Sequence, residues 1–94
     1  MAILVVSEVA GVTAEQDTAL VKTLDLDGSP PAGFRIRMAG PTAHGWRIAS
    51  LWDSEADWER FRNERLVPAL TGAGRQLSPI EIWPIETVDT VWEL

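Results

Sequence analysis

Apolar side chains alternate with a period of two in four segments of the chain, which predicts four β-strands. Residues 2–10 are apolar on both alternating faces, so we expect a strand that is covered on both sides. Residues 34–40 and 45–53 follow as two strands joined at Pro41–His44, and residues 79–87 form the last strand. Pro84 cannot donate a ladder hydrogen bond, which favours an edge or bulge position in that last strand.

The two middle strands differ in the side chains that they place on each face. In residues 34–40 the alternation predicts Phe34, Ile36 and Met38 on one face, with Arg35 and Arg37 on the other. In the second strand, one face is expected to carry Trp46, Ile48, Ser50 and Trp52. A shift of one residue in the register exchanges the faces of a strand, and alternation alone does not fix that register.

Two segments have the 3.6-residue period of an amphipathic helix. The first is predicted to begin at Thr13, with Gln16 completing a capping box, and to run to about Leu24. The second is predicted to begin after Ser54, with acidic residues in its first turn and arginines later, an order that suits the helix dipole. Pro68 predicts either the end of this helix or the start of a second short one.

The resulting order, β-α-β-β-α-β, is the ferredoxin-like split βαβ pattern, so we predict the α+β class with helices on one face of an antiparallel sheet. The opposite face also carries apolar residues such as Leu4 and Val6. The 94 residues are expected to form one domain, 1–94, with a small core and no cysteine to reinforce it. We therefore expect two such sheets to pair in a homodimer.

The charge and the scarce residue types argue against several partners. A net charge of −6 and a pI of about 4.6 repel phosphate backbones, so we expect no nucleic acid partner. No basic amphipathic helix and no long apolar run occur, so we expect no membrane partner and a cytoplasmic location. His44 is the only histidine, and no phosphate-binding or dinucleotide motif is present, so we expect no metal and no cofactor.

Residues 51–56, Leu-Trp-Asp-Ser-Glu-Ala, and the helix after them resemble the dimeric α+β barrel superfamily. That superfamily includes the antibiotic-biosynthesis monooxygenase-like proteins and the stress-responsive barrel-type small proteins, and the likeness in element order covers nearly the whole chain. The resemblance implies two sheets that close into a barrel across a two-fold axis, with a small cavity between sheet and helices in each subunit. The matching motif is structural, so the resemblance implies a fold more strongly than a function.

The activities of this superfamily are varied, and they include cofactor-free quinone-forming oxygenases, polyketide cyclases, lactone isomerases and haem-degrading enzymes. The resemblance places Trp52, at the end of its strand, in the lining of the cavity. Haem-binding members carry a ligand histidine on or after the second helix, and residues 55–94 contain none. Cyclase members of the superfamily use histidines in the cavity. The only histidine of this chain is His44, which is expected in a hairpin at the sheet edge.

Tryptophans are the first group of candidate ligand-binding residues, because five in 94 residues is a high content. For Trp58, at helical spacing from Phe61, filling of a small core is the favoured interpretation. Trp83 and Trp92 are also candidates for a dimer interface. The four that could form an aromatic cage around a flat ligand are Trp46, Trp52, Trp58 and Trp83.

Polar side chains supply the second group of candidates. Arg35, Arg37 and Arg47 would form a cationic patch for a carboxylate or phenolate if they shared one face of the sheet, and otherwise would pair with acidic residues. Ser7 and Ser50 are inward positions that could hydrogen-bond a ligand but lack an evident base as nucleophiles. His44 could act as a general base, but the simpler interpretation is a histidine in an exposed loop without a catalytic role. The predicted ligand-binding set is Ser7, Arg37, Trp46, Arg47, Ser50, Trp52, Trp58 and Trp83.

Three functional hypotheses follow from these features. The first is a cofactor-independent enzyme that oxygenates, cyclises or isomerises a small hydrophobic or aromatic, polyketide-like molecule held in an apolar pocket. The second is a protein that binds such a molecule without changing it, which the lack of a clear acid–base pair favours. The third is a structural or interaction protein whose pocket is filled by its own tryptophans.

Overall fold

The computed structural model describes residues 1–90, and within them one four-stranded antiparallel sheet has the strand order β2-β3-β1-β4. The edge strands are β2 and β4, and the edge position of β4 is one of the two that Pro84 favoured. The strands, in chain order, are β1 (Ala2–Ala10), β2 (Phe34–Pro41), β3 (Gly45–Trp52) and β4 (Ile80–Ile85). Trp92 lies outside the described residues.

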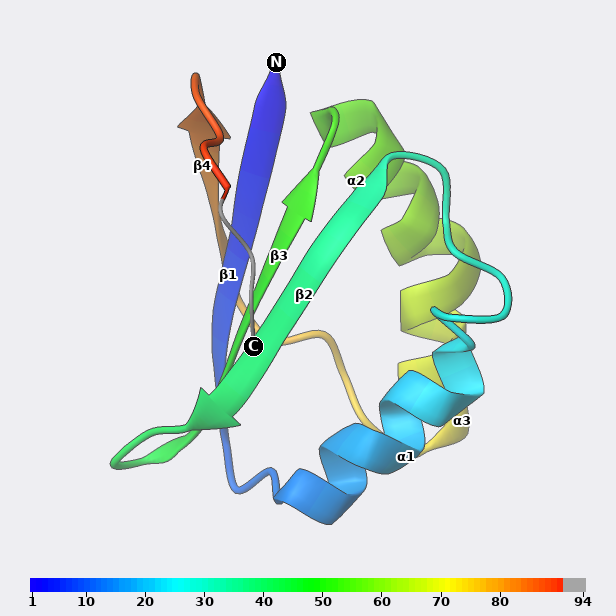
Figure 1. The fold of residues 1–94 in the computed structure, drawn as a ribbon. Coiled ribbons are helices and arrows are strands. Elements are labelled where there is room, and N and C mark those ends of the chain that lie inside the picture. The colour runs from blue at the N-terminus through cyan, green and yellow to red at the C-terminus, as the bar shows by residue number, and fades with distance from the viewer. Residues whose placement is uncertain (91–94) are drawn as a thin grey trace.

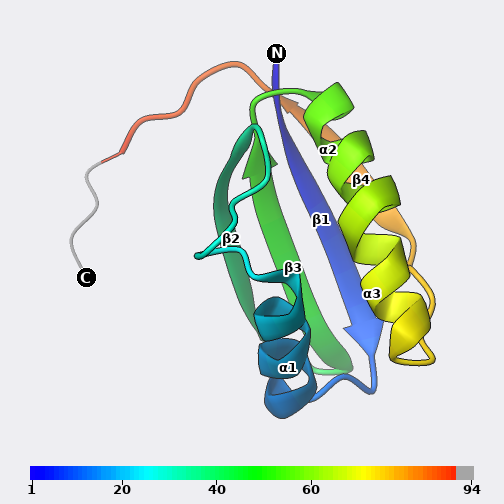
Figure 2. The ribbon, with the colours of Figure 1, turned by 90° about the vertical axis from the view of Figure 1, so that its right-hand side faces the viewer.

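Helices α1 (Ala14–Leu24), α2 (Glu55–Phe61) and α3 (Val67–Gly72) all lie on one face of the sheet, as Figures 1 and 2 show. Both predicted helix starts are confirmed by their capping hydrogen bonds. The Gln16 N–H donates to Thr13 Oγ1 at 3.2 Å, and the Asp57 N–H donates to Ser54 Oγ at 3.2 Å. The predicted ferredoxin-like α+β fold is therefore observed. No helix within residues 1–90 is long and apolar enough to cross a membrane.

A π-helical segment, η1 (Arg62–Leu66), joins α2 to α3 without a break in the helix. The N–H of Val67 reaches back five residues to the carbonyl of Arg62, and Pro68 stands in the first turn of α3. The wider turn accommodates a proline that lacks an N–H and would clash with an ordinary α-helical turn. The second short helix predicted at Pro68 is thus confirmed, but it continues the first one.

A β-bulge in β2 overturns the alternation predicted for that strand. Between Phe34 and Ile36 the pairing with β3 shifts by one residue. Phe34 and Arg37 consequently face the helices, whereas Ile36 and Met38 face the other side of the sheet. The predicted grouping of Phe34 with Ile36 and Met38 is wrong, because one extra residue in the bulge moves every later side chain to the opposite face.

The hydrophobic core lies between the inner face of the sheet, which faces the helices, and the helices themselves. The Trp52 side chain is almost fully buried at its centre. Its ring centroid lies 5.0 Å from that of Phe61 and 5.8 Å from that of Trp58, within the range of favourable aromatic pairs. The buried residues of this cluster are Ile3, Val5, Leu24, Leu26, Trp52, Trp58 and Phe61.

The outer face of the sheet, which points away from the helices, carries apolar side chains from every strand. We call them the outer apolar belt: Ile36, Met38, Leu51, Ala49, Leu4, Val6 and Trp83, brought into adjacent rows by the strand register. The side chains of Trp83 and Met38 are 50% and 48% exposed. Two cross-strand ion pairs flank the belt, Arg35–Asp53 and Arg47–Glu8.

Candidate functional site

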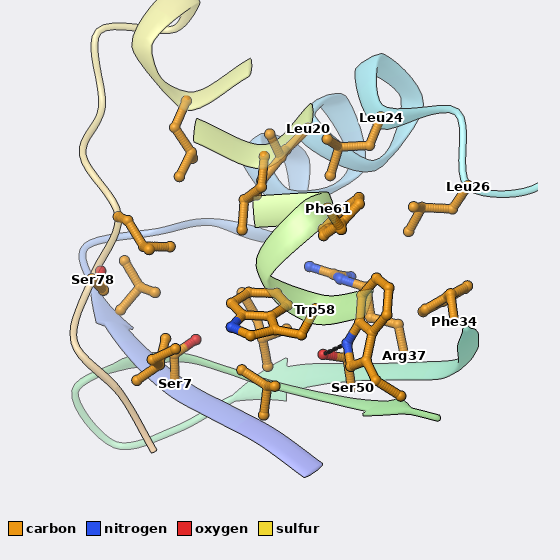
Figure 3. A pocket seen from close by; sticks show the side chains of 18 of the residues that line it. Ser7, Leu20, Leu24, Leu26, Phe34, Arg37, Ser50, Trp58, Phe61 and Ser78 are labelled. Carbon is orange, nitrogen blue, oxygen red and sulfur yellow. Dashed lines mark hydrogen bonds between the residues drawn. The ribbon is translucent and has the colours of Figure 1, made fainter. Parts of the chain in front are cut away.

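A cavity of about 80 Å³ lies between the inner face of the sheet and the helices, and Figure 3 shows its lining side chains. Most of the wall is apolar and comes from β1, β3, α1 and α2, while residues 75–78, between α3 and β4, close one side. Ligand pockets usually measure about 300–1,000 Å³, and an apolar cavity of about 150 Å³ suffices for benzene. The aromatic rings therefore fill much of the space, and the remaining void accepts only a small part of a ring system.

Trp52 and Ser50 form a satisfied polar pair in the wall of the cavity. Alternation along β3 turns both side chains inward, and both are buried. The Trp52 Nε1–H donates to Ser50 Oγ at 2.9 Å, which Figure 3 marks as a dashed line. This hydrogen bond fixes the orientation of the indole ring and leaves the Ser50 hydroxyl hydrogen free to rotate toward the cavity.

Arg37 reaches the cavity because of the bulge in β2, and it is held there by Asp17 of α1. Its Nη2 and Nη1 donate to the two carboxylate oxygens of Asp17 at 2.5 and 3.1 Å, a bidentate pair. Asp17 is a buried residue that the sequence analysis missed. A signal was present: Asp17 precedes Leu20, Val21 and Leu24 by three, four and seven residues, which places it on the buried face of α1.

The remaining polar lining comes from the other side of the cavity. Ser7 contributes from β1, Trp58 from α2, and Arg75, Gln76 and Ser78 from the segment before β4. Within residues 1–90, Nε1 of Trp58 has no hydrogen-bond acceptor. The cavity therefore presents hydroxyl, indole and guanidinium donors within apolar walls.

The predicted ligand-binding residues fall into two groups in the structure. Five of the eight line the cavity: Ser7, Arg37, Ser50, Trp52 and Trp58. The other three do not line it: Trp46 near the hairpin end of β3, Arg47 on the outer face, and Trp83 in the outer apolar belt. Ligand binding by any of them stays a prediction.

The three arginines of the predicted cationic patch do not share a face. Arg35 and Arg47 lie on the outer face, where their guanidinium groups meet Asp53 at 2.6 Å and Glu8 at 2.7 Å, and only Arg37 faces the cavity. The bulge between Arg35 and Arg37 is the physical reason for this separation. The hydrogen bond from Arg35, more than its charge, holds the pKa of the Asp53 carboxyl below its ordinary value.

His44 is exposed in the hairpin between β2 and β3 and does not line the cavity. Its backbone N–H lies 3.4 Å from Thr42 Oγ1, as expected in a turn. Among residues 1–90, no group of three or more His, Cys, Asp or Glu side chains is placed to hold a metal ion. The loop interpretation of His44 thus agrees with its position.

Comparisons with known proteins relate this chain to others through its fold. No protein-family model and no curated protein sequence matches it. A solved structure does match: a mutant of SnoaB, a cofactor-independent oxygenase from Streptomyces nogalater. The TM-score is 0.62, the sequence identity is 14%, and the match covers 93% of each chain. At this identity the likeness establishes the fold, and it confirms the α+β architecture that the resemblance implied.

Proposed function

We propose that this chain binds a small aromatic or polyketide-like molecule in the cavity and oxygenates it without a cofactor. The apolar cavity built around Trp52 carries this proposal, because it lies between sheet and helices in a fold shared with a cofactor-independent oxygenase. The lining suits an aromatic ligand, since tilted aromatic rings form part of the walls and a few donors can orient its polar end. Oxygenation is favoured over cyclisation or isomerisation by the activity of SnoaB.

The electron balance of such a reaction narrows the substrate class. Without a cofactor, the substrate must supply all the electrons that reduce O₂. An aromatic ketone with an activated CH₂ group meets this need: both C–H bonds and the O–O bond break, a new C=O bond forms, and the second oxygen atom leaves as water. The carbon loses four electrons and O₂ gains four. The cavity would contribute orientation and exclusion of bulk water.

The size of the cavity adds a requirement to this proposal. A substrate with two or three fused rings exceeds a void of about 80 Å³. Residues 75–78 form the side of the cavity that lies outside the helices and the sheet. We therefore expect this segment to move outward when a fused-ring substrate binds.

Oxygen uptake with anthrone, a fused-ring ketone with an activated CH₂ group, tests the proposed activity. We expect the protein to raise the rate of O₂ uptake above the rate without protein, with one O₂ consumed per anthrone. The anthraquinone product should contain one ¹⁸O atom when ¹⁸O₂ is supplied. Ser50→Ala removes the acceptor that orients Trp52, so we expect a loss of about fivefold, the effect of one hydrogen bond. Ser29→Ala, in an exposed loop, is the matched control. A rate equal to that without protein would contradict the oxygenase proposal.

A non-catalytic binding protein is the second candidate. The composition of the cavity lining favours it. The lining contributed by residues 1–90 contains no Asp, Glu or His side chain. Proton transfer by a positioned side chain is a common part of enzyme mechanisms, and these residue types usually supply it. Native mass spectrometry separates the two candidates, because a carrier retains its ligand and releases it chemically unchanged.

The homodimer belongs to the same proposal, with a second copy of this chain covering the outer apolar belt. A contiguous apolar surface with half-exposed Trp83 and Met38 is typical of an interaction site. Each flanking arginine is paired with its own carboxylate, so these two ion pairs add no net charge to the face that would meet a second copy. A two-fold arrangement would place the belt of each copy against that of the other.

A further inference from the structure

Trp58 lines the cavity, and its indole nitrogen is a buried donor without an acceptor among residues 1–90. The Trp58 residue is 4% exposed, and among residues 1–90 no oxygen accepts a hydrogen bond from its Nε1–H. Buried polar groups in proteins are nearly always hydrogen-bonded, so an exception inside a cavity calls for a physical explanation. The neighbouring Trp52 shows the contrast, because Ser50 satisfies its Nε1–H.

The direction of this donor is visible in Figure 3. The nitrogen lies on the edge of the Trp58 ring that is turned toward Ser7 and Ser78, away from the Ser50–Trp52 pair. The cavity thus has two different sides. On one side, Trp52 donates to Ser50, and Arg37 donates to Asp17, which lies outside the lining. On the other side, the Trp58 Nε1–H points into apolar surroundings with two serines nearby in the lining.

We propose that the Trp58 Nε1–H donates a hydrogen bond to an acceptor oxygen of the ligand, and that the ligand is an aryl ketone or quinone. An indole N–H can only donate, so the group opposite it must accept. The apolar wall requires that this oxygen be attached to a hydrophobic ring. The inference rests on the proposed function for its cavity, but not on turnover there.

The competing explanation is that packing leaves this indole unsatisfied without any ligand. Trp46 provides a direct comparison, because its Nε1 is also buried and also has no acceptor among residues 1–90. Trp46 does not line the cavity. A donor that serves a ligand should therefore respond to a carbonyl compound at Trp58 and not at Trp46.

Two probes of the same shape distinguish these explanations: acetophenone, and α-methylstyrene, in which a CH₂ group replaces the carbonyl oxygen. The readout is the indole N–H region of a ¹H–¹⁵N NMR spectrum of the full chain, with the Trp58 signal assigned from the Trp58→Phe variant. We expect acetophenone to move the Trp58 proton signal downfield and α-methylstyrene to leave it nearly in place. Trp58→Phe should weaken acetophenone binding about 3- to 10-fold, while Ser29→Ala, in an exposed loop, should leave it unchanged.

Each result of this titration has a distinct meaning. If both probes bind and move the Trp58 signal equally, the acceptor-oxygen inference is overturned while binding in the cavity stands. If neither probe binds, small-molecule binding in the cavity is contradicted, and the inference falls with it. If Trp58→Phe does not fold, nuclear Overhauser contacts assign the signal, and the two titrations of the unaltered chain decide the outcome.

Discussion

Arg35 and Arg37 stand two positions apart in the sequence and have opposite environments in the fold. The side chains of Arg37 and Asp17 are 17% and 10% exposed, whereas those of Arg35 and Asp53 are 63% and 45% exposed. Both pairs are bidentate, so the difference in burial decides their energetic roles. Removing one partner of a buried pair leaves an uncompensated charge, but an exposed charge is resolvated by water.

Asp17→Asn is expected to lower the free energy of unfolding by about 3 kcal/mol, because Arg37 would remain in the cavity wall without its carboxylate. Asp53→Asn is the matched control on the exposed pair and should cost much less, because water resolvates the Arg35 charge. Urea unfolding of the two variants measures both effects. Equal losses in the two variants would show that the Asp17–Arg37 pair behaves as a surface pair.

The pH dependence of Asp53 is a second prediction at the residue scale. The hydrogen bond from Arg35 lowers the pKa of Asp53 in the folded state, so the pair stabilises the fold above the unfolded-state pKa. That contribution is lost as the pH falls through the folded-state pKa. A ¹³C carboxyl titration should place the Asp53 midpoint below the ordinary pKa of an aspartate. Arg35→Gln should raise the Asp53 midpoint, and an unchanged midpoint would contradict this cause.

At the scale of elements, the continuous helix from α2 to α3 fixes the position of the aromatic cluster. Arg65, in the π-helical segment, donates to the carbonyls of Leu24 and Ser29, which ties this helix to the end of α1. The N-terminus of α2 is held by Ser54, directly after the strand that carries Trp52. The loop before β2 also approaches this point closely: a Cβ on Gly33 would lie 2.2 Å from Asp57 Oδ2.

Ser54→Ala is expected to lower the free energy of unfolding by about 1 kcal/mol, because the Asp57 N–H loses its acceptor at the start of α2. Ser54→Thr is the control, since threonine keeps the hydroxyl that accepts from the Asp57 N–H and donates to the Asp57 carboxylate, and should retain most of the stability. Chemical denaturation of both variants provides the comparison. The cap has no energetic role here if alanine and threonine give the same stability as serine.

For the whole molecule, the outer apolar belt and the inner cavity occupy opposite faces of the same sheet. Val88 and Thr90, after β4, share a groove with Ala2, Ile36 and Leu51 at one end of the belt. Because the belt and the cavity lie on opposite faces, association and ligand binding can be tested separately. A substitution on the outer face should change association and leave the inner cavity unaltered.

Met38→Glu is expected to convert a dimer of this chain into monomers, because it places a charge in the outer apolar belt that would be buried between two copies. Val67→Glu is the matched control, because Val67 is also an exposed apolar residue but lies on the helical side. Sedimentation velocity of the three proteins measures the outcome. A monomeric unaltered chain would remove the homodimer from the proposal.

Sequence periodicity predicted most of the elements because their signals are local. The capping box at Thr13, the N-cap at Ser54 and the alternation along β3 each involve residues a few positions apart. The register of β2 was not accessible in this way. The bulge near Arg35 depends on how β2 pairs with β3, and nothing in its own alternation signals the extra residue.

The candidate site was predictable only where strand alternation or helical periodicity determined it. Ser7, Ser50 and Trp52 follow from the inward faces of β1 and β3. Trp58 was expected in the core from its spacing to Phe61, but its lack of an acceptor is a property of the packed structure. Asp17 was missed because an acid in the first turn of a helix ordinarily faces water and favours the helix dipole.

The sequence by itself determined the order of the elements, the starts of the two predicted helices and the apolar character of both sheet faces, since these depend on neighbouring residues. The tertiary structure alone decided which arginine reaches the cavity, which acid pairs with it and how much space the aromatic rings leave. Those features arise from contacts between distant parts of the chain, such as the pair of Arg37 in β2 and Asp17 in α1, which are 20 positions apart. Register shifts and packing volumes are set by such distant contacts, which periodicity along the chain does not encode.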